Sequence, residues 1–277
     1  MTRFDGRVVL ITGAGRGLGA AYARAFAERG ASVVVHDAGV GRSGEGGDPG
    51  VADAVVEEIR TGGGGAIASY ENLDSAKSCL HVVENAVSEL GRLDVLVNNA
   101  GLVVYEEIED AGRSWEVMRR VHVDAPFHLS RAAFPVMKRQ GYGRLVFTTS
   151  GIAMSAEETR PGLAAYCMGK MAQFGLMVVL AAEGRDNGIL SNAISPVAAT
   201  RVYTRDAEPG TLEPEQVAPG VLLLASEECP VNGVVLSAAG GRFGAPRWVG
   251  SRGFDFGRKP VEPEQIIERW ADIEALD

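Results

Sequence analysis

A phenol and an ammonium group lie four residues apart in the stretch Tyr166–Lys170. In a helix, that spacing places both side chains on one face. A phenol exchanges protons with an alcohol efficiently only if its pKa falls from about 10 toward neutrality. A positive charge ~4–5 Å away, at an effective dielectric constant of about 20, supplies ~3–4 kcal/mol toward that change. The pair therefore predicts acid–base chemistry on a hydroxyl or carbonyl group.

A glycine-rich turn lies near the start of the chain, in the stretch Thr12–Gly19. It follows a continuous apolar run and precedes an alanine-rich helical pattern, which is the context that gives such a motif meaning. Gly13 permits the tight turn, and Gly17 and Gly19 allow close approach to a phosphate and to the sheet. The helix that follows offers free N–H groups and the positive end of its dipole. The turn therefore predicts a site for a dinucleotide pyrophosphate.

Asp37 ends the next expected strand, 18 residues after Gly19 (37 − 19). A carboxylate at this position accepts hydrogen bonds from the adenosine ribose hydroxyls and repels a 2′-phosphate. The residue therefore favours NAD over NADP. Arg16 and Arg42 are nearby cations that could accept a 2′-phosphate, so an NADPH-linked ketoreductase stays an alternative.

The elements that must position these residues follow a repeated strand–helix alternation. Such alternation predicts a single α/β domain over residues 1–277 with a Rossmann-type, doubly wound parallel sheet of about seven strands and helices on both faces. Residues 39–50 are expected to form a glycine-rich surface loop. The expected strands are 8–12, 32–36, 66–70, 94–98, 144–149, 190–194 and 234–237, and the expected helices are 18–29, 51–61, 76–90, 114–140 (kinked or broken at its prolines) and 164–187.

Composition narrows the class of protein further. The chain has 277 residues, 46% hydrophobic and 23% charged, with a net charge of −9 and no basic stripe, so nucleic acid is not expected as a partner. No uncharged apolar stretch approaches membrane-spanning length, and no apolar signal region opens the chain, so we expect a cytoplasmic protein away from membranes. Three cysteines without a C-x-x-C motif predict reduced thiols and no metal site.

Four ordered motifs resemble those of the short-chain dehydrogenase/reductase family: the glycine turn, Asn98–Gly101, a serine after the fifth strand, and Tyr166–Lys170. The resemblance covers essentially the whole chain. Within the family, the stretches 33–37 and 120–123 and the tail 260–270 are similar to the (3R)-hydroxyacyl-CoA dehydrogenase domains of type 2 peroxisomal multifunctional enzymes and bacterial relatives.

The resemblance implies an oxidoreductase that interconverts a secondary alcohol and a ketone. Asn72 and Leu73 would flank the adenine, Asn99 would lie beside the cofactor ribose, and Asn98 would hold the central strands together. The implied catalytic residues are Ser150, Tyr166, Lys170 and His122. The implied cofactor-binding residues are Gly13, Arg16, Gly17, Leu18, Gly19, Asp37, Asn72, Leu73, Asn99, Ala100, Gly101, Tyr166, Lys170, Pro196, Val197, Ala199 and Thr200.

Three features depart from the family pattern. Ser150 precedes Tyr166 by 16 residues (166 − 150), which is longer than usual and predicts a short insertion within 151–163. Ser155 is therefore a competing candidate for the catalytic serine. His122 replaces the asparagine that many members use to hold a proton-relaying water; histidine can bind water and titrates near neutrality, or it is structural. Val197 replaces a usual glycine, which leaves the nicotinamide contacts open.

The substrate is specified less tightly. Residues 151–163 and 201–216 would line its site with both apolar and charged side chains. The resemblance favours a 3-hydroxyacyl thioester such as a CoA thioester; a steroid or another bulky secondary alcohol is the alternative. It also implies a homodimer or homotetramer, with helices within 91–140 and 164–187 at the interface. The C-terminal extension 242–277 would dock on its own subunit or on a second one. A dinucleotide-binding sensor without turnover is disfavoured because serine, tyrosine and lysine are all present.

Overall fold

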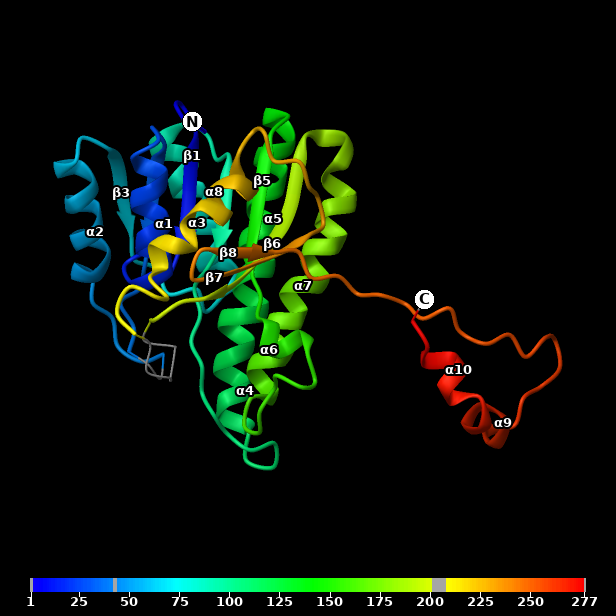
Figure 1. Cartoon of the computed structure of the whole chain (residues 1–277). Helices are drawn as coiled ribbons and strands as arrows, with labels where there is room; N and C mark the ends of the chain where they lie inside the picture. The colour runs from blue at the N-terminus through cyan, green and yellow to red at the C-terminus, as the bar shows by residue number, and fades with distance from the viewer. Residues whose placement is uncertain (1, 42–43, 201–207, 277) are drawn as a thin grey trace. The chain divides into compact units, whose positions relative to one another are not determined.

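The computed structural model describes residues 2–41, 44–200 and 208–276. The chain forms two compact units, residues 1–245 and residues 246–277. The larger unit is the α/β, Rossmann-type doubly wound fold expected from the sequence (Figure 1). The smaller unit begins four residues after the expected start of the C-terminal extension at 242 (246 − 242).

The described part of the larger unit is built on one eight-stranded sheet, ordered β3-β2-β1-β4-β5-β6-β7-β8. The first seven strands are parallel, and β8 runs antiparallel beside β7. The sequence predicted about seven strands and assigned residues 242–244 to the extension, so β8 is the strand that was not predicted. The strands are β1 (Val8–Thr12), β2 (Ser32–His36), β3 (Gly65–Ser69), β4 (Val95–Asn98), β5 (Gly143–Thr148), β6 (Ile189–Val197), β7 (Val235–Ala239) and β8 (Arg242–Gly244).

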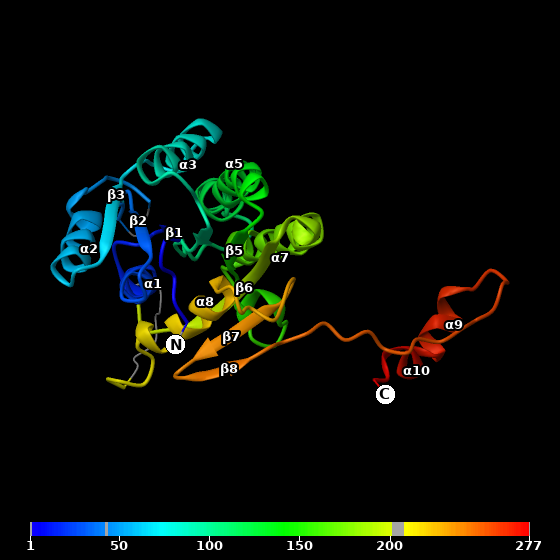
Figure 2. The same cartoon turned by 90° about the horizontal axis from the view of Figure 1, so that it is seen from above.

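Helices cover both faces of the sheet (Figure 2). Side chains along each strand alternate between the faces, so Val9 and Ile11 join one core cluster while Val8 and Leu10 join the other. One face packs against α1 (Gly17–Ala27), α2 (Gly50–Thr61) and α8 (Ala218–Ala225), and the other against α3 (Ala76–Leu90), α5 (Ala125–Gln140) and α7 (Ala164–Gly184).

The expected helix over 114–140 is a continuous helical run whose regular α-pattern is interrupted just before Pro126. It consists of α4 (Gly112–Arg119), a π-helical turn η1 (Arg120–Asp124) and α5. Pro126 follows the π-helical turn by two residues, and Pro135 lies inside α5. Because proline lacks the N–H that an α-helix needs, the regular pattern cannot continue through Pro126. π-helical turns are frequent at functional sites, and this one carries His122. The shorter elements are α6 (Gly151–Met154), η2 (Arg185–Asn187) and η3 (Pro214–Gln216).

One helical stretch has the length of a membrane span. Residues 164–187 are long and apolar enough, by length and composition, to cross a membrane. Lys170 and the charges after it interrupt its apolar run, so it is not an uncharged apolar stretch of that length. In this fold α7 packs on β5 and β6, and helices that pack in a protein core pass the same test.

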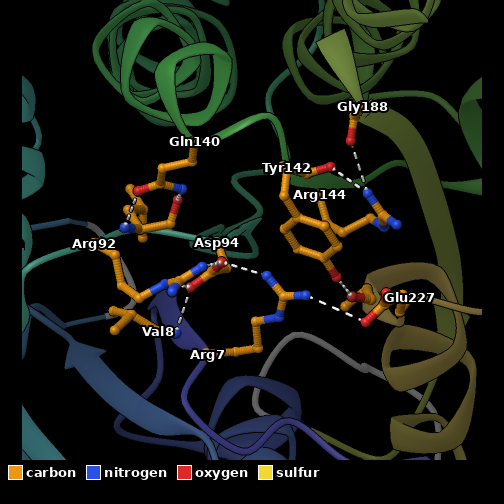
Figure 3. A network of polar contacts seen from close by, with 12 residues as sticks. Arg7, Val8, Arg92, Asp94, Gln140, Tyr142, Arg144, Gly188 and Glu227 are labelled. Carbon is orange, nitrogen blue, oxygen red and sulfur yellow. Dashed lines mark hydrogen bonds and ion pairs between the residues drawn. The ribbon is translucent and has the colours of Figure 1, made fainter.

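A polar network joins the amino ends of the strands (Figure 3). Asp94, fully buried ahead of β4, accepts hydrogen bonds from the Arg7 guanidinium at 3.0 Å and from Arg92 at 2.6 and 2.7 Å. Its second oxygen also accepts the backbone N–H of Val8 at 2.9 Å. Arg7 continues to Glu227 at 3.3 Å. The carboxylate therefore connects the starts of β1 and β4, and Arg7 extends this connection toward α8.

The ring of Tyr142 extends the same network to β5. The guanidinium carbons of Arg7 and Arg144 lie 3.7 and 4.2 Å from the ring centroid. Arg144 also donates to the carbonyl oxygens of Ser226 at 2.8 Å and Gly188 at 3.1 Å, which closes the network onto the start of β6 (Figure 3). Cation–π contacts of this kind add stability beyond the buried area.

Replacing Asp94 with Asn is expected to lower the free energy of unfolding by about 2–4 kcal/mol. The amide keeps the size of the side chain but leaves two guanidinium groups without their carboxylate. Urea denaturation measures the change, and dinucleotide affinity should stay at its wild-type value because the network lies at the opposite ends of the strands from the glycine turn. Asp5→Asn, which breaks an exposed pair with Arg3, is the control and should leave stability unchanged. Equal stability of the Asp94 variant and the wild type would show that the Asp94 network does not stabilise the fold.

The smaller unit contains two short helices, α9 (Pro263–Glu268) and α10 (Trp270–Glu274). Phe254 and Phe256 meet edge to face, with ring centroids 4.8 Å apart, and the Arg269 guanidinium lies 4.9 Å from the Phe254 ring. The Trp270 indole N–H donates to Glu274 at 2.8 Å. These aromatic side chains therefore have partners within their own unit, and docking on a second subunit stays a prediction.

Candidate active site

The glycine turn lies at the carboxyl end of β1, where the sheet order reverses between β1 and β4. Ligands of open α/β sheets bind at such a switch point. Gly13 has a φ of +65°, and a Cβ there would lie 2.8 Å from the Ala100 Cα. A Cβ on Gly19 would lie 2.1 Å from the Gly13 carbonyl oxygen. The close approach of the turn, the start of α1 and the loop after β4 therefore requires glycine at both positions.

The first turn of α1 is open to an anion. Its N–H groups, from Gly17, Leu18 and Gly19, belong to the helix turn that has no intrahelical partners, and Arg16 at the N-cap provides no side-chain cap. Thr200, after β6, reaches the same turn, because a Cβ on Gly17 would lie 3.2 Å from the Thr200 Cγ2. These residues fit a dinucleotide pyrophosphate, and the fold brings together two groups of predicted residues that are far apart in sequence.

Asp37 sits directly beside this turn, just after β2. Its two carboxylate oxygens accept the backbone N–H groups of Gly15 at 2.9 Å and Gly39 at 2.8 Å. The side chain is partly buried, so these bonds fix the carboxylate at the edge of the turn. A ribose lying on the turn would meet a fixed negative charge here, which fits the expected role of Asp37. Arg16 is exposed, and Arg42 lies outside the described residues.

Of the two neighbouring asparagines, Asn98 does not have the arrangement expected for it, and the role of Asn99 beside the cofactor ribose stays a prediction. The Asn99 amide donates to the carbonyl oxygens of Thr12 at 2.8 Å and Gly13 at 3.0 Å, so Asn99 joins the strands. The Asn98 amide is buried and has no hydrogen-bond partner among the described residues. Asn98 follows Leu96 on the same face of β4, toward the helices that cover that face, whereas Asn99 faces the turn. The predicted linking role therefore belongs to Asn99.

Three of the predicted catalytic side chains meet at the carboxyl end of β5. Lys170 is buried, its Nζ donating to the Thr148 carbonyl oxygen at 2.7 Å and lying 5.7 Å from the centroid of the Tyr166 ring. Ser150, just before α6, acts on the Tyr166 phenol as a hydrogen-bonding partner. Ser155 lies at the far end of α6, so the structure places Ser150 beside the phenol.

Burial has the largest effect on the pKa values of Tyr166 and Lys170. It raises the pKa of Tyr166 above its usual value, and hydrogen bonding by Ser150 opposes part of that rise. Burial also lowers the pKa of Lys170 to about 7. The expectation that the Lys170 charge brings the tyrosine pKa down is therefore not met in this structure. The physical reason is that the same burial that isolates the phenol also destabilises the neighbouring ammonium.

His122 packs tightly between the loop after β4 and α7. Its Nε2 lies 2.8 Å from the Leu102 carbonyl oxygen, and its ring meets the Tyr166 ring edge to face with centroids 5.5 Å apart. A Cβ on Gly101 would lie 2.9 Å from the His122 ring, and one on Gly169 would lie 2.6 Å from its Cβ. The glycines therefore provide the space that this histidine needs.

The same burial changes the chemistry expected of His122. A carbonyl oxygen only accepts, so Nε2 carries the proton and Nδ1 is a buried acceptor without a partner among the described residues. Burial, with a contribution from the Lys170 charge, lowers the pKa of His122 to about 3. The ring is therefore neutral at physiological pH, and the expectation that it titrates near neutrality is wrong.

A profile of the short chain dehydrogenase family matches residues 7–208. The chain belongs to this family. It is 41% identical to the peroxisomal multifunctional enzyme type 2 of Mus musculus over 98% of its own length, but covers only 37% of that enzyme. It therefore spans little more than a third of that relative.

Two mycobacterial relatives are similar over nearly their full lengths. A short-chain type dehydrogenase/reductase of Mycobacterium tuberculosis is 37% identical over 98% of this chain and 94% of its own. The crystal structure of a short chain dehydrogenase from Mycobacterium avium has a TM-score of 0.84 at 36% identity, covering 98% of this chain and 95% of that one. The predicted family and fold are confirmed.

The remaining predicted residues of this family member lie at the same edge of the sheet or beside it. Pro196 and Val197 end β6, and the Ala199 N–H donates to the Leu212 carbonyl oxygen at 2.7 Å. Asn72 is exposed between β3 and α3, whereas Leu73 is buried in the core, so only Asn72 presents its side chain to solvent. Of the segment 201–216, residues 201–207 lie outside the described residues.

Sequence reasoning missed two threonines that organise the site. The Thr12 hydroxyl accepts the backbone N–H groups of both Asn99 and Ala100 at 3.1 Å, which ties the loop after β4 to the turn after β1. The Thr149 hydroxyl donates to the Lys170 carbonyl oxygen at 3.1 Å and so fixes α7 to the end of β5. A signal existed for Thr12, because it is the first residue of the glycine motif, but nothing in the sequence distinguishes Thr149.

Proposed function

We propose that this protein is an NAD-dependent dehydrogenase that interconverts a secondary alcohol and a ketone. The observation that carries the proposal is the gathering of Ser150, Tyr166 and Lys170 at the sheet edge that also holds the glycine turn and Asp37. An alcohol seated there would lie between an acid–base phenol and a hydrogen-bonding hydroxyl.

The residues divide the work of the reaction. In the oxidising direction, the Tyr166 phenolate removes the hydroxyl proton of the substrate, and the Ser150 hydroxyl donates a hydrogen bond to the same oxygen as charge develops. Lys170 binds the nicotinamide ribose and, when protonated, stabilises the phenolate. Bound NAD supplies the acceptor for the hydride that leaves the carbinol carbon. The neutral His122 keeps the Tyr166 ring and the Leu102 carbonyl in place.

Asp37 would make the enzyme prefer NAD. Isothermal titration of the wild type is expected to give tight binding of NADH and weak binding of NADPH, because the fixed carboxylate repels a 2′-phosphate. Asp37→Ala should reduce the ratio of the NADPH and NADH dissociation constants by about tenfold or more. A tenfold change corresponds to about 1.4 kcal/mol of binding free energy. The matched control is Asp53→Ala on α2, which should leave the ratio unchanged. An unchanged ratio in Asp37→Ala would show that Asp37 does not read the ribose, and an NADPH preference in the wild type would favour the ketoreductase alternative.

For the substrate, we favour a 3-hydroxyacyl thioester, with a CoA thioester as the first candidate. Similarity to the mouse multifunctional enzyme over nearly the whole chain supports this choice. The alternative is a steroid or another bulky secondary alcohol. Both are tested by following NADH formation at 340 nm with panels of 3-hydroxyacyl-CoA thioesters, in both configurations, and of steroid alcohols. Turnover of steroids but not thioesters would replace the favoured substrate.

We further propose a homodimer or homotetramer formed through α5 and α7. Support comes from exposed apolar side chains on these helices, namely Phe127, Met168, Val178 and Val179. Light scattering coupled to size-exclusion chromatography measures the mass, and a monomer would refute the proposal. The cytoplasmic location stays a prediction.

A further inference from the structure

The described ends of the glycine-rich segment after β2, Ala38 and Asp48, meet at a narrow neck. The Asp48 N–H donates to the Ala38 carbonyl oxygen at 3.3 Å, so the chain returns to its starting point after ten residues (48 − 38). Gly39 has a φ of +67°, and a Cβ there would lie 2.2 Å from the Asp48 carbonyl oxygen. This neck stands next to Asp37, which accepts the Gly39 N–H. One end of the loop is therefore anchored beside the predicted ribose site.

The other end of this loop reaches the opposite side of the switch point. A Cβ on Gly44 would lie 3.4 Å from both Leu102, in the loop after β4, and Val117, on α4. Glu45 forms an ion pair with Arg113 of α4 at 2.7 Å. Leu102 and Val117 belong to the small apolar cluster that also includes Tyr166. The loop is thus attached to the part of the molecule that carries the acid–base phenol.

The order of the strands decides what lies between these two attachments. β1 stands between β2 and β4 in the sheet. Residues 44–47 run from the contacts with Leu102 and Val117 back to the neck beside β2, and they therefore span the end of β1, where the glycine turn begins. A surface loop without a role would need neither the neck at Ala38 and Asp48 nor the partner on α4.

We propose that residues 44–47, held by the Glu45–Arg113 ion pair, form a strap that closes over the dinucleotide on the glycine turn. The inference rests on the proposed function, because it names a further part of the same cofactor site. Glu45 and Arg113 are positioning residues in this scheme, since they act on the strap and not on the reacting atoms. The bound dinucleotide leaves only after the ion pair separates.

The ion pair sets the size of the expected effect. Its side chains are exposed to 72% and 71%, so the pair is an ordinary surface contact. Such pairs are worth up to about 1 kcal/mol, which corresponds to about a fivefold change in a rate. Because exposed charges are screened by salt, the rate at which the wild type releases NADH should rise with ionic strength.

Stopped-flow fluorescence tests the strap directly, by mixing the NADH-loaded enzyme with excess NAD. We expect Arg113→Ala and Glu45→Ala each to raise the NADH dissociation rate about threefold to fivefold and to remove most of its salt dependence. The charge swap that combines Glu45→Arg with Arg113→Glu should restore the slow rate. Glu58→Ala, which breaks another exposed pair between α1 and α2, is the matched control and should release NADH like the wild type.

The outcomes separate the strap from the function on which it rests. A wild type that binds NADH, with release rates and salt dependence unchanged in both single variants, overturns the strap and leaves the dehydrogenase proposal standing. A charge-swap variant that releases NADH as fast as the single variants also overturns the strap, because the ion pair would then not be what holds it closed. A wild type that binds no NADH overturns the proposed function and the strap together.

Discussion

Tyr166→Phe is expected to lower kcat by about 10²–10⁴-fold while NADH binds with nearly its wild-type affinity. The range is what a positioned general acid or base contributes. The substitution removes one oxygen and keeps the ring, so the edge-to-face contact with His122 and the fold around it persist. Steady-state kinetics at saturating substrate give the loss in kcat, and titration with NADH shows that the cofactor site is intact.

Tyr105→Phe is the control for that experiment. Tyr105 is an exposed tyrosine in the loop after β4, so its substitution removes the same oxygen from a phenol outside the predicted catalytic group. We expect its kcat to stay near the wild-type value. Activity retained in Tyr166→Phe would remove Tyr166 as the acid or base, and an equal loss in both variants would indicate a general disturbance of the site.

Lys170→Met is expected to give a protein that is catalytically impaired yet more stable. Burial lowers the pKa of Lys170 to about 7, against 10.5 for the free side chain. Between these values the unfolded chain holds a proton that the folded chain has lost, so wild-type stability rises as pH increases from 7 to 10.5. At pH 7 the methionine variant should gain about 2–4 kcal/mol, after the lost hydrogen bond to the Thr148 carbonyl is counted.

Urea denaturation at a series of pH values measures this effect. The wild type should become more stable from pH 7 to pH 10, the variant should lack that component, and the difference between them should shrink with rising pH. The control is Lys77→Met, because Lys77 is an exposed lysine on α3. The stability of this variant should change with pH as the stability of the wild type does. A Lys170→Met curve parallel to that of the wild type would show that the lysine titrates as it does in water.

The fold was largely predictable because its determinants are local. Continuous apolar runs such as 8–12 and 32–36 are typical of strands buried on both faces, and both strands have the predicted bounds. β8 was missed because its three residues pair only with β7, and so few residues show no periodicity. The π-helical turn was missed for a similar reason, since its hydrogen-bond pattern leaves no mark in residue spacing.

The sequence indicates which residues lie at the candidate site better than it indicates their pKa values. Lys170 lies beside the Tyr166 ring, and Asp37 contacts the glycine turn, in line with their motif spacing. The roles of Asn98 and Asn99 depend on which face of β4 each residue occupies at the end of the strand, a difference of one residue that the motif does not encode. The pKa values depend on how deeply His122 and Lys170 are buried. Their surroundings include Leu102 and Thr148, which are distant from them in sequence.

The network centred on Asp94 separates the contacts that stabilise the sheet from the residues of the proposed reaction. The contacts that tie β1, β4, β5 and β6 together lie at one end of the strands, and the proposed chemistry lies at the other. Loops at the chemical end can therefore lengthen, shorten or change charge without loosening the contacts that hold the strands in order. Changes within 151–163 leave the hydrogen bonds of Asp94 in place, so a protein with this network can vary its substrate loop without losing the contacts that order its strands.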